Sequence, residues 1–525
     1  MSNAFHHPKI NVRRGCEDMR QKLCATGFSP LVARVMAARD ITDDQDATPP
    51  LRNLPPPDFL PDINRLCHLL AEAIAAQQRI CVVGDYDADG MSATALAVDC
   101  LQQLGAVVSW TIPDRQQHGY GLHCDIVERE AAANTKVLLT VDNGISASQA
   151  VARAKELGLI VCITDHHLPD KKSLPPADCI VNPQLSDNTA GKCLAGVGVI
   201  FYVMAALRRH LAKELDLRCY LDLVALGTVA DCVPLNTINR ALVSGGLAQM
   251  RQGKGRPGLM MLANCLRGRI KNITCRDLAF RLAPRINAAG RFNEAEQGVL
   301  CLLAKEPSEA RQLAAKLDRF NSRRIDLMKN LLQAAQAQIT DSLSPGLVVA
   351  DKDWPCGMLG LLAGQLCDAH NRPTLVFGWQ NGAWRGSGRA PKGWHLHKLI
   401  STLDTAGNTL RFGGHAGAVG LTVADVDIFT AAFMRACDAA AVNQDEALWV
   451  VDAMPPVEEI TPSAVEELNS MVWGMDFPSP QFADNFWVAE QRPLNGGHLR
   501  LVLFNDTFRL PAIYYNNTVI NDSVT

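Results

Sequence analysis

Short apolar runs alternate with amphipathic stretches along the chain from about residue 60. Between the runs lie segments rich in good helix formers, in which apolar residues recur at helical spacing. Strands that alternate with helices in this way are typical of a mostly parallel, doubly wound sheet. We therefore predict an α/β domain over residues 56–295. The clearest runs are 80–83, 137–139 and 159–163, and the clearest helical segments are 93–104 and 146–157.

The rest of the chain divides into four further segments by pattern and composition. Residues 1–55 predict an N-terminal helical segment that ends in a proline-rich break, and 296–344 predict one or two long connecting helices. A second α/β pattern predicts a domain over 345–440, and short strand-like runs predict a β-rich domain over 441–525. The expected fold class is α/β, with two α/β domains joined by a long helix and followed by a β-rich domain.

Composition limits the possible classes of protein. The 525 residues are 48% hydrophobic and 20% charged, as in ordinary globular proteins, and the net charge of -3 gives no bulk support for nucleic-acid binding. The 17 cysteines form no C-x-x-C pair, so we expect reduced cysteines in a cytoplasmic protein. The N-terminus lacks an apolar signal segment, and the apolar stretch 194–207 is too short to span a membrane, so a buried helix is expected there.

Acidic and histidine side chains gather at the ends of the predicted strands. The first run is followed by Asp85, Asp87 and Asp89 at alternate positions, with glycines on either side. Alternate side chains of an extended segment point the same way, so these like charges repel unless a cation lies among them. The second run ends at Asp142, and the third ends at the Asp-His-His triplet 165–167.

These clusters point to a metal site. Sites in open parallel sheets form at the carboxyl ends of the strands, where all three clusters fall. A further acid, Asp231, lies in the apolar segment 226–233. One acidic turn would be weak evidence, but three at successive strand ends predict a site for one or two divalent cations. Carboxylates with one or two imidazoles suit Mn²⁺ or Mg²⁺, and the imidazole favours Mn²⁺.

The same motifs carry a family resemblance. Segments 85–90, 142–144 and 165–167, followed by Asp231, resemble in order the four signature motifs of the DHH phosphoesterase superfamily. Other stretches resemble the RecJ family of exonucleases within it, and the resemblance runs from about residue 15 to about residue 500. These stretches are 119–122, 194–199, 226–231, 284–291 and 412–420.

The resemblance implies a fold and an activity. The fold would comprise a DHH domain, a DHHA1 domain and an OB-like β domain. The activity would be metal-dependent hydrolysis of single-stranded DNA from the 5′ end, which releases 5′-mononucleotides in DNA repair and recombination. Asp142 would bridge two cations, and Asp85 and His167 would be catalytic, with His167 contacting the scissile phosphate or donating a proton. The metal ligands implied by the resemblance are Asp87, Asp89, Asp142, His166 and Asp231.

A basic span lies next to these motifs despite the net charge. Residues 240–291 contain 11 Lys or Arg residues and a single acid, Asp277. Such a span can be a solvated face or a surface that follows phosphates, and the neighbouring metal motifs favour the second interpretation. Arg285 and Arg291 flank small residues that let a backbone approach closely, so both are candidate substrate contacts.

Glycine-rich segments of the second α/β domain add further candidates. Ser387 and Arg389 offer a hydroxyl and a guanidinium beside flexible backbone N–H groups, which fits either a phosphate cradle or a turn beside a strand. In RecJ-like proteins this stretch resembles part of a pocket for the 5′-terminal phosphate, with Arg115 as a further member. His415 matches the family's substrate-binding motif.

Two features depart from the family pattern. Pro355 stands where the family usually has a histidine, and proline removes a backbone donor. The β-rich C-terminal segment is short for an OB domain, so we expect an incomplete barrel with open edges. Weaker affinity for single strands or reduced processivity is the expected effect.

Two other functions share part of this evidence. A DHH phosphodiesterase acting on short oligonucleotides or cyclic dinucleotides would carry the same metal motifs, but the chain length and the basic span argue against it. A catalytically weak DNA-binding relative would usually lack metal ligands, which this chain retains. The family implies single-stranded DNA as substrate, a single-strand-binding protein and a helicase as partners, no membrane, and a monomer.

Overall fold

A computed structural model describes residues 9–114, 121–339, 344–403, 409–440, 448–507 and 509–515. The chain forms two compact units. The larger unit spans Leu54–Asp445, and the smaller unit combines Met1–Asn53 with Glu446–Thr525. No helix within the described ranges is both long enough and apolar enough to cross a membrane.

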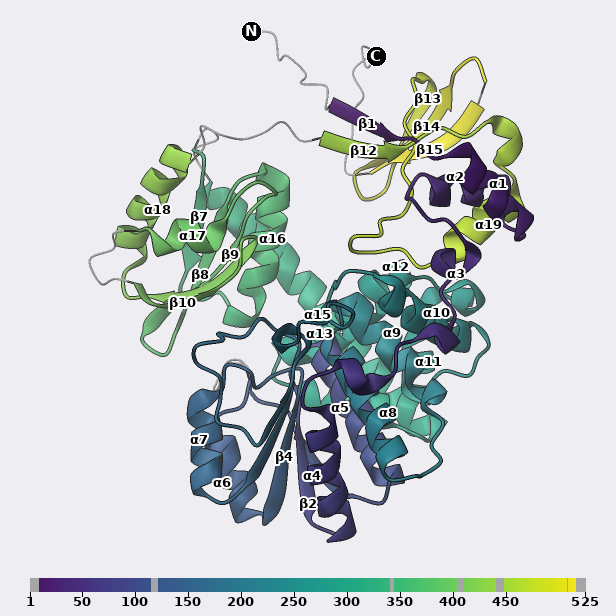
Figure 1. The fold of residues 1–525 in the computed structure, drawn as a ribbon. Coiled ribbons are helices and arrows are strands. Elements are labelled where there is room, and N and C mark those ends of the chain that lie inside the picture. Colours follow the sequence, from purple (N-terminus) through teal and green to yellow (C-terminus); the bar gives the residue numbers. More distant parts are fainter. Residues whose placement is uncertain are drawn as a thin grey trace. The chain divides into compact units, whose positions relative to one another are not determined.

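A five-stranded parallel sheet forms the centre of the first half of the larger unit (Figure 1). The strand order is β3-β2-β4-β5-β6, which confirms the mostly parallel sheet predicted from the apolar runs. The runs are apolar because the sheet is covered on both faces. The strands are β2 (Arg79–Val83), β3 (Val107–Thr111), β4 (Thr135–Val141), β5 (Ile160–Thr164) and β6 (Cys179–Val181).

Helices cover the two faces of this sheet. In Figure 1, α6 (Cys124–Ala132) and α7 (Ser148–Glu156) lie on one face, and α4 (Ile63–Ala75) and α5 (Ala88–Gln103) lie on the other. Because α5 contacts α8, α9 and α14 as well as the sheet, it is buried over almost its whole length. The surrounding elements therefore fix α5, which begins within the aspartate motif 85–90.

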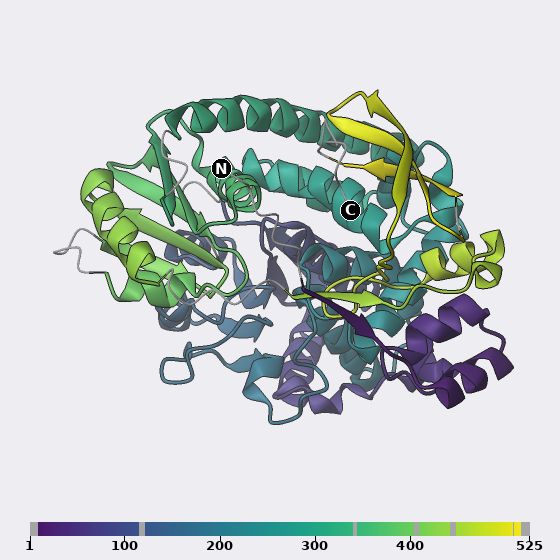
Figure 2. The same cartoon turned by 90° about the horizontal axis from the view of Figure 1, so that it is seen from above.

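A helical layer follows β6 and leads to the second half of the unit. The apolar stretch 194–207 forms most of α8, as expected. One uninterrupted helix of 32 residues, α15, provides the predicted connection (Figure 2). The helices are α8 (Gly196–His210), α9 (Leu221–Ala230), α10 (Thr237–Arg251), α11 (Pro257–Leu262), α12 (Cys275–Asp277), a π-helical turn η7 (Leu278–Leu282), α13 (Ala283–Arg291), α14 (Ala295–Leu303) and α15 (Pro307–Gln338).

The second half of the unit contains a mixed five-stranded sheet in the order β10-β11-β9-β8-β7. Only β7 and β8 pair in parallel, and the other neighbours are antiparallel. The elements are β7 (Leu347–Asp351), α16 (Leu359–His370), β8 (Thr374–Gln380), β9 (Ala383–Arg389), α17 (Leu396–Ser401), β10 (Thr409–Gly414), β11 (Ala418–Val423) and α18 (Val426–Ala440).

The smaller unit pairs the two ends of the chain. Strand β1 runs parallel to β12, and β13, β14 and β15 form an antiparallel sheet. Among the described residues these are two separate sheets, and the N-terminal segment contributes a strand as well as helices. The elements are β1 (Lys9–Arg13), α1 (Glu17–Ala25), α2 (Pro30–Ala37), α3 (Asp44–Ala47), β12 (Leu448–Asp452), α19 (Pro462–Ser470), β13 (Trp487–Leu494), β14 (His498–Phe504) and β15 (Arg509–Tyr514).

Candidate metal centre

The carboxyl ends of β2, β4 and β5 bring the predicted metal ligands together with Asp231, which lies at the end of α9. Because these strands are neighbours in a parallel sheet, the residues that follow them meet at one edge. Three groups of side chains each offer ligand atoms within 4.8 Å of one another. The groups are Asp85 with Asp87 and Asp142, Asp89 with His166 and Asp231, and Asp142 with His166 and His167.

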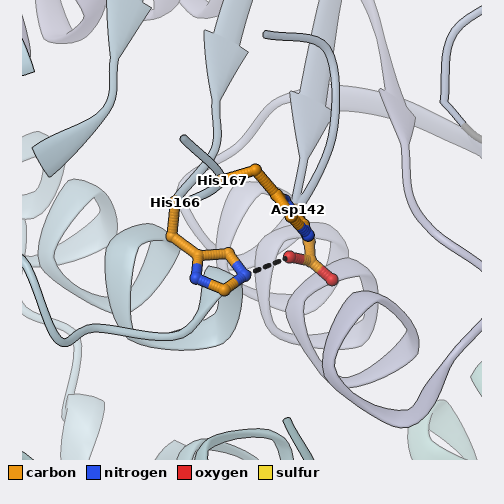
Figure 3. A group of neighbouring side chains, drawn as sticks. All are labelled: Asp142, His166 and His167. Atoms are coloured by element: carbon orange, nitrogen blue, oxygen red, sulfur yellow. Dashed lines mark ion pairs between the residues drawn. The ribbon is translucent and has the colours of Figure 1, made fainter. Parts of the chain in front are cut away.

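Asp142 lies at the centre of this arrangement, since it is a member of two of the groups. Its backbone has a φ of 64°, a left-handed conformation that is uncommon outside glycine. Figure 3 shows the imidazole of His166 directed toward the Asp142 carboxylate. His166 Nε2 lies 3.2 Å from Asp142 Oδ1 and 3.4 Å from Asp231 Oδ2. This placement fits the predicted bridging role of Asp142.

His166 has the properties of a neutral metal ligand. Burial, together with the charge of His167, lowers its pKa to about 4. Its ring is oriented by a hydrogen bond to the backbone of Leu194. The buried Nε2 atom makes no hydrogen bond within the described structure, although two carboxylate oxygens lie nearby. A cation between the nitrogen and the carboxylates would satisfy all three atoms.

The buried carboxylates of the centre repel one another. Burial and the neighbouring aspartates raise the pKa values of Asp89 and Asp142 well above their ordinary range. Burial and the charge of Asp87 raise the pKa of Asp231 to about 7. A divalent cation offsets both the burial and the repulsion, so the donor set fits the predicted metal.

Backbone N–H groups fix two of the aspartates. Asp87 caps α5, because its Oδ1 accepts hydrogen bonds from the N–H groups of Asp89 and Gly90, each at 3.0 Å. Asp89 accepts from Gly196 N at 2.7 Å and from Val197 N at 3.0 Å, at the first turn of α8. Asp87 and Asp89, two of the candidate ligands, are therefore held in place by the protein itself.

Three glycines give the aspartates room. A Cβ atom on Gly90 would lie 2.5 Å from Asp85 Cβ, and one on Gly196 would lie 2.6 Å from Asp142 Cγ. A Cβ atom on Gly227 would overlap Asp89 Oδ1. These glycines lie within the sequence motifs, but their role could not be predicted from the sequence, because the aspartates that they accommodate lie on other segments or other turns.

Asp165 positions His167, a role that the sequence analysis also missed. Asp165 Oδ1 accepts from the backbone N–H of His167 at 3.1 Å and lies 2.7 Å from its Nδ1, and Oδ2 accepts from Ile145 N at 3.0 Å. Burial alone would lower the pKa of His167, but the hydrogen bond to Asp165 and the nearby carboxylates raise it to about 9. His167 is therefore a cation at neutral pH whose Nδ1 is already engaged.

The basic span 240–291 is only partly available to a ligand. Arg240 donates to Leu235 O, and Arg251 donates to Ile273 O. Three more arginines donate hydrogen bonds within the unit. Arg256 donates to Asp99, Arg285 donates to Asp318 and to the Arg281 carbonyl, and Arg291 donates to Gly357 O at 2.8 Å. The exposed members are Lys254, Arg267, Arg269, Lys271 and Arg276.

The candidate substrate contacts of the second sheet form a small cradle. A Cβ atom on Gly360, in the first turn of α16, would lie 3.2 Å from Ser387 Oγ and 3.4 Å from Arg389 Nη2. The hydroxyl and the guanidinium thus converge on a helix N-terminus, which carries a partial positive charge. His415 is exposed at the β10–β11 turn, and Arg115 lies outside the described residues.

Comparisons with known proteins agree with this geometry. The family model "DHH family, N-terminal domain" matches residues 79–228, the "DHHA1 domain" matches 343–441, and the "RecJ OB domain" matches 451–523. The single-stranded-DNA-specific exonuclease RecJ of Dickeya dadantii is 37% identical, over 90% of this chain and 86% of that protein. The chain belongs to the RecJ family. The resemblance seen in the motifs is thereby confirmed.

Other RecJ proteins give the same result. RecJ of Escherichia coli K12 is 36% identical, over 94% of this chain and 90% of that protein. A crystal structure of RecJ from Thermus thermophilus in complex with Mn²⁺ matches with a TM-score of 0.83 at 30% identity, over 98% of this chain and 74% of that one. A second structure of the same protein contains Mg²⁺. The predicted cofactors are therefore those found in RecJ structures.

Proposed function

We propose that this RecJ-family protein is a metal-dependent exonuclease that hydrolyses single-stranded DNA from the 5′ end and releases 5′-mononucleotides. The observation that carries the proposal is the meeting of five aspartates and two histidines at one edge of the parallel sheet. The names of the relatives specify single-stranded DNA as their substrate, and this supports the same substrate class here.

The side chains divide naturally between two cations. Asp85, Asp87 and Asp142 would hold one, while Asp89, His166 and Asp231 would hold the second, with Asp142 between them. This assignment adds Asp85 to the predicted ligands. Mn²⁺ suits a site with an imidazole, and Mg²⁺ is the other candidate. When bound, two such cations neutralise phosphate charge and lower the pKa of water.

His167 would contact the scissile phosphate. Its Nδ1 is engaged by Asp165, so Nε2 is the nitrogen available to substrate. As a cation at neutral pH, the ring can donate a hydrogen bond to a non-bridging phosphate oxygen or a proton to the departing oxygen.

The cradle formed by Gly360, Ser387 and Arg389 would bind the terminal 5′ phosphate. A hydroxyl, a guanidinium and the N-terminus of α16 are complementary to a phosphate that carries two negative charges. Binding the end of the strand in this way would enforce digestion from that end. Further candidate contacts to the strand are Arg115, Arg285, Arg291 and His415.

The family resemblance also supports a wider context for this activity. It supports a role in DNA repair and recombination in the cytoplasm, as a monomer that works with a single-strand-binding protein and a helicase.

A nuclease assay with Mn²⁺ tests the proposal. One strand carries a 5′ phosphate and a 3′ label, and its matched controls are the blunt duplex and the same strand blocked at its 5′ end. Stepwise loss of the unblocked single strand alone is expected. Cleavage of the blocked strand at a similar rate would contradict digestion from the 5′ end.

A further inference from the structure

The most exposed aromatic side chain of the larger unit that the structure describes is Phe280. Phe280 is 75% exposed, although Leu278 and Leu282 in the same π-helical turn, η7, are fully buried. Turns of this kind are rare and often occur at functional sites. Isolated exposed apolar residues are common, so the surroundings of Phe280 must decide whether it has a role.

Those surroundings are strongly basic. Residues 267–281 contain five Lys or Arg residues and one acid, Asp277. The Arg276 guanidinium lies 5.9 Å from the centre of the Phe280 ring. Arg281 pairs with Asp277 but stays 44% exposed. The short turn Ala263–Leu266 packs against η7. The other cations, Arg267, Arg269 and Lys271, follow this turn in the sequence, and all three are exposed.

Phe280 is connected to the metal centre through a single helical segment. The turn η7 continues directly into α13, which ends beside the aspartate motif 85–89. Asn287 Oδ1 accepts from Ala88 N at 2.7 Å, and Gly290 leaves no room for a Cβ against the Tyr86 carbonyl. Phe280 and Asn287 are seven positions apart on this segment, which corresponds to about 10 Å along its axis. At the stacked spacing of about 3.4 Å per nucleotide, a strand covers that distance in about three nucleotides.

We propose that Phe280 and the cations around it form a platform on which a base of the single strand stacks, a few nucleotides from the scissile phosphate. The proposal rests on the proposed function for the identity of the strand. An exposed ring accepts any base, because every base has a flat face, and the cations follow the phosphates. This combination binds single strands without reading their sequence, as an exonuclease requires.

Fluorescence anisotropy of labelled single strands in EDTA, which prevents cleavage, tests the platform. Phe280→Ala should weaken binding of a 15-nucleotide strand by roughly fivefold to thirtyfold, because base stacking on an aromatic contributes about 1 to 2 kcal/mol. Phe280→Trp should bind like the wild type. Ile325→Ala, which truncates another exposed apolar side chain on α15, is the matched control and should have no effect.

A scan of single abasic sites along the strand identifies the stacked base. One abasic position should weaken binding to the wild type and cause no further loss with Phe280→Ala. Arg276→Gln should instead reduce the slope of log K against log salt by about one. Equal binding by Phe280→Ala and the wild type, or an abasic effect that persists in the variant, would overturn the proposal.

Cleavage of a short substrate separates this proposal from the proposed function. A 5′-phosphorylated dinucleotide does not reach the platform, so Phe280→Ala should cleave it at the wild-type rate. If the wild type itself cleaves no strand, the proposed function fails, whereas the binding measurements still decide whether Phe280 contacts nucleic acid.

Discussion

Adding one methyl group at Gly196 should disable the metal centre while leaving the fold intact. Gly196 begins α8, and its backbone is compatible with alanine because its φ is not positive. A Cβ atom there would lie 2.6 Å from Asp142 Cγ, whereas ordinary contact begins at 3.4 Å. Asp142 Cβ would be closer still, at 2.5 Å, so the Asp142 side chain must move by about 0.9 Å.

A shift of this size is large for a metal ligand. Metal–ligand distances tolerate changes of about 0.2 Å, and a misplacement of about 1 Å in an active site can cost about a hundredfold in rate. We expect Gly196→Ala to weaken Mn²⁺ binding and to lower kcat/KM about a hundredfold. Replacing glycine also restricts the unfolded chain, which contributes about 0.4–1 kcal/mol to stability and offsets part of the steric cost.

Isothermal titration with Mn²⁺, a nuclease assay and thermal unfolding together measure these effects. The matched control is Gly198→Ala in the same helix, whose new Cβ would meet only the flexible end of Leu194 at 3.1 Å. The control should bind Mn²⁺ and cleave DNA like the wild type. Wild-type metal affinity and activity in a folded Gly196→Ala protein would refute the claim that this glycine makes room for the central ligand.

Three further predictions follow from the same contacts. Asp165→Asn should lower the pKa of His167 from about 9, so kcat should begin to decline at a lower pH than in the wild type. The Mn²⁺ affinity should be unchanged, and an unshifted pH profile would exclude this role of Asp165. Gly360→Val should fill the cradle and reduce the preference for 5′-phosphorylated over 5′-hydroxyl strands, whereas Gly364→Ala, with open space around it, should retain the preference. Because the pKa of Asp231 is raised to about 7, protons compete with the metal and Mn²⁺ affinity should fall by roughly tenfold per pH unit below 7, as titration calorimetry can measure. The folding stability of the metal-free protein should depend on pH in the opposite direction to the Mn²⁺ affinity. The contribution of Asp231 to stability is present at acid pH and is lost as the pH rises to about 7.

The parallel sheet and its metal site were predictable because their signals are local. Each strand is an apolar run, and three of the ligand groups follow directly after strands, so the alternation of strands and helices places these groups at one edge. Asp231 is the exception, because it lies at the end of helix α9. The triplet 165–167 illustrates the limit of local signals. The sequence placed the triplet near the other strand-end clusters. It did not show that Asp165 orients His167, because that contact depends on the direction of the two side chains.

Other features depend on contacts between distant segments. The pairing of β1 with β12 joins Ile10 to Trp449, and nothing in either segment specifies the other. The basic span was predicted from its charges alone, whereas the structure shows Arg240 and Arg251 bound to backbone carbonyls. The space that Gly227 leaves for Asp89 also depends on how two helices pack.

The central claim is that Asp142 holds two divalent cations together for phosphodiester hydrolysis. The most direct test is the number of Mn²⁺ ions bound per chain, measured together with cleavage of a 5′-phosphorylated single strand, for the wild type and for Asp142→Ala. The wild type should bind two ions and cleave the strand, whereas the folded variant should bind at most one ion and cleave nothing. Two bound ions and near-normal cleavage in the folded Asp142→Ala protein would contradict it.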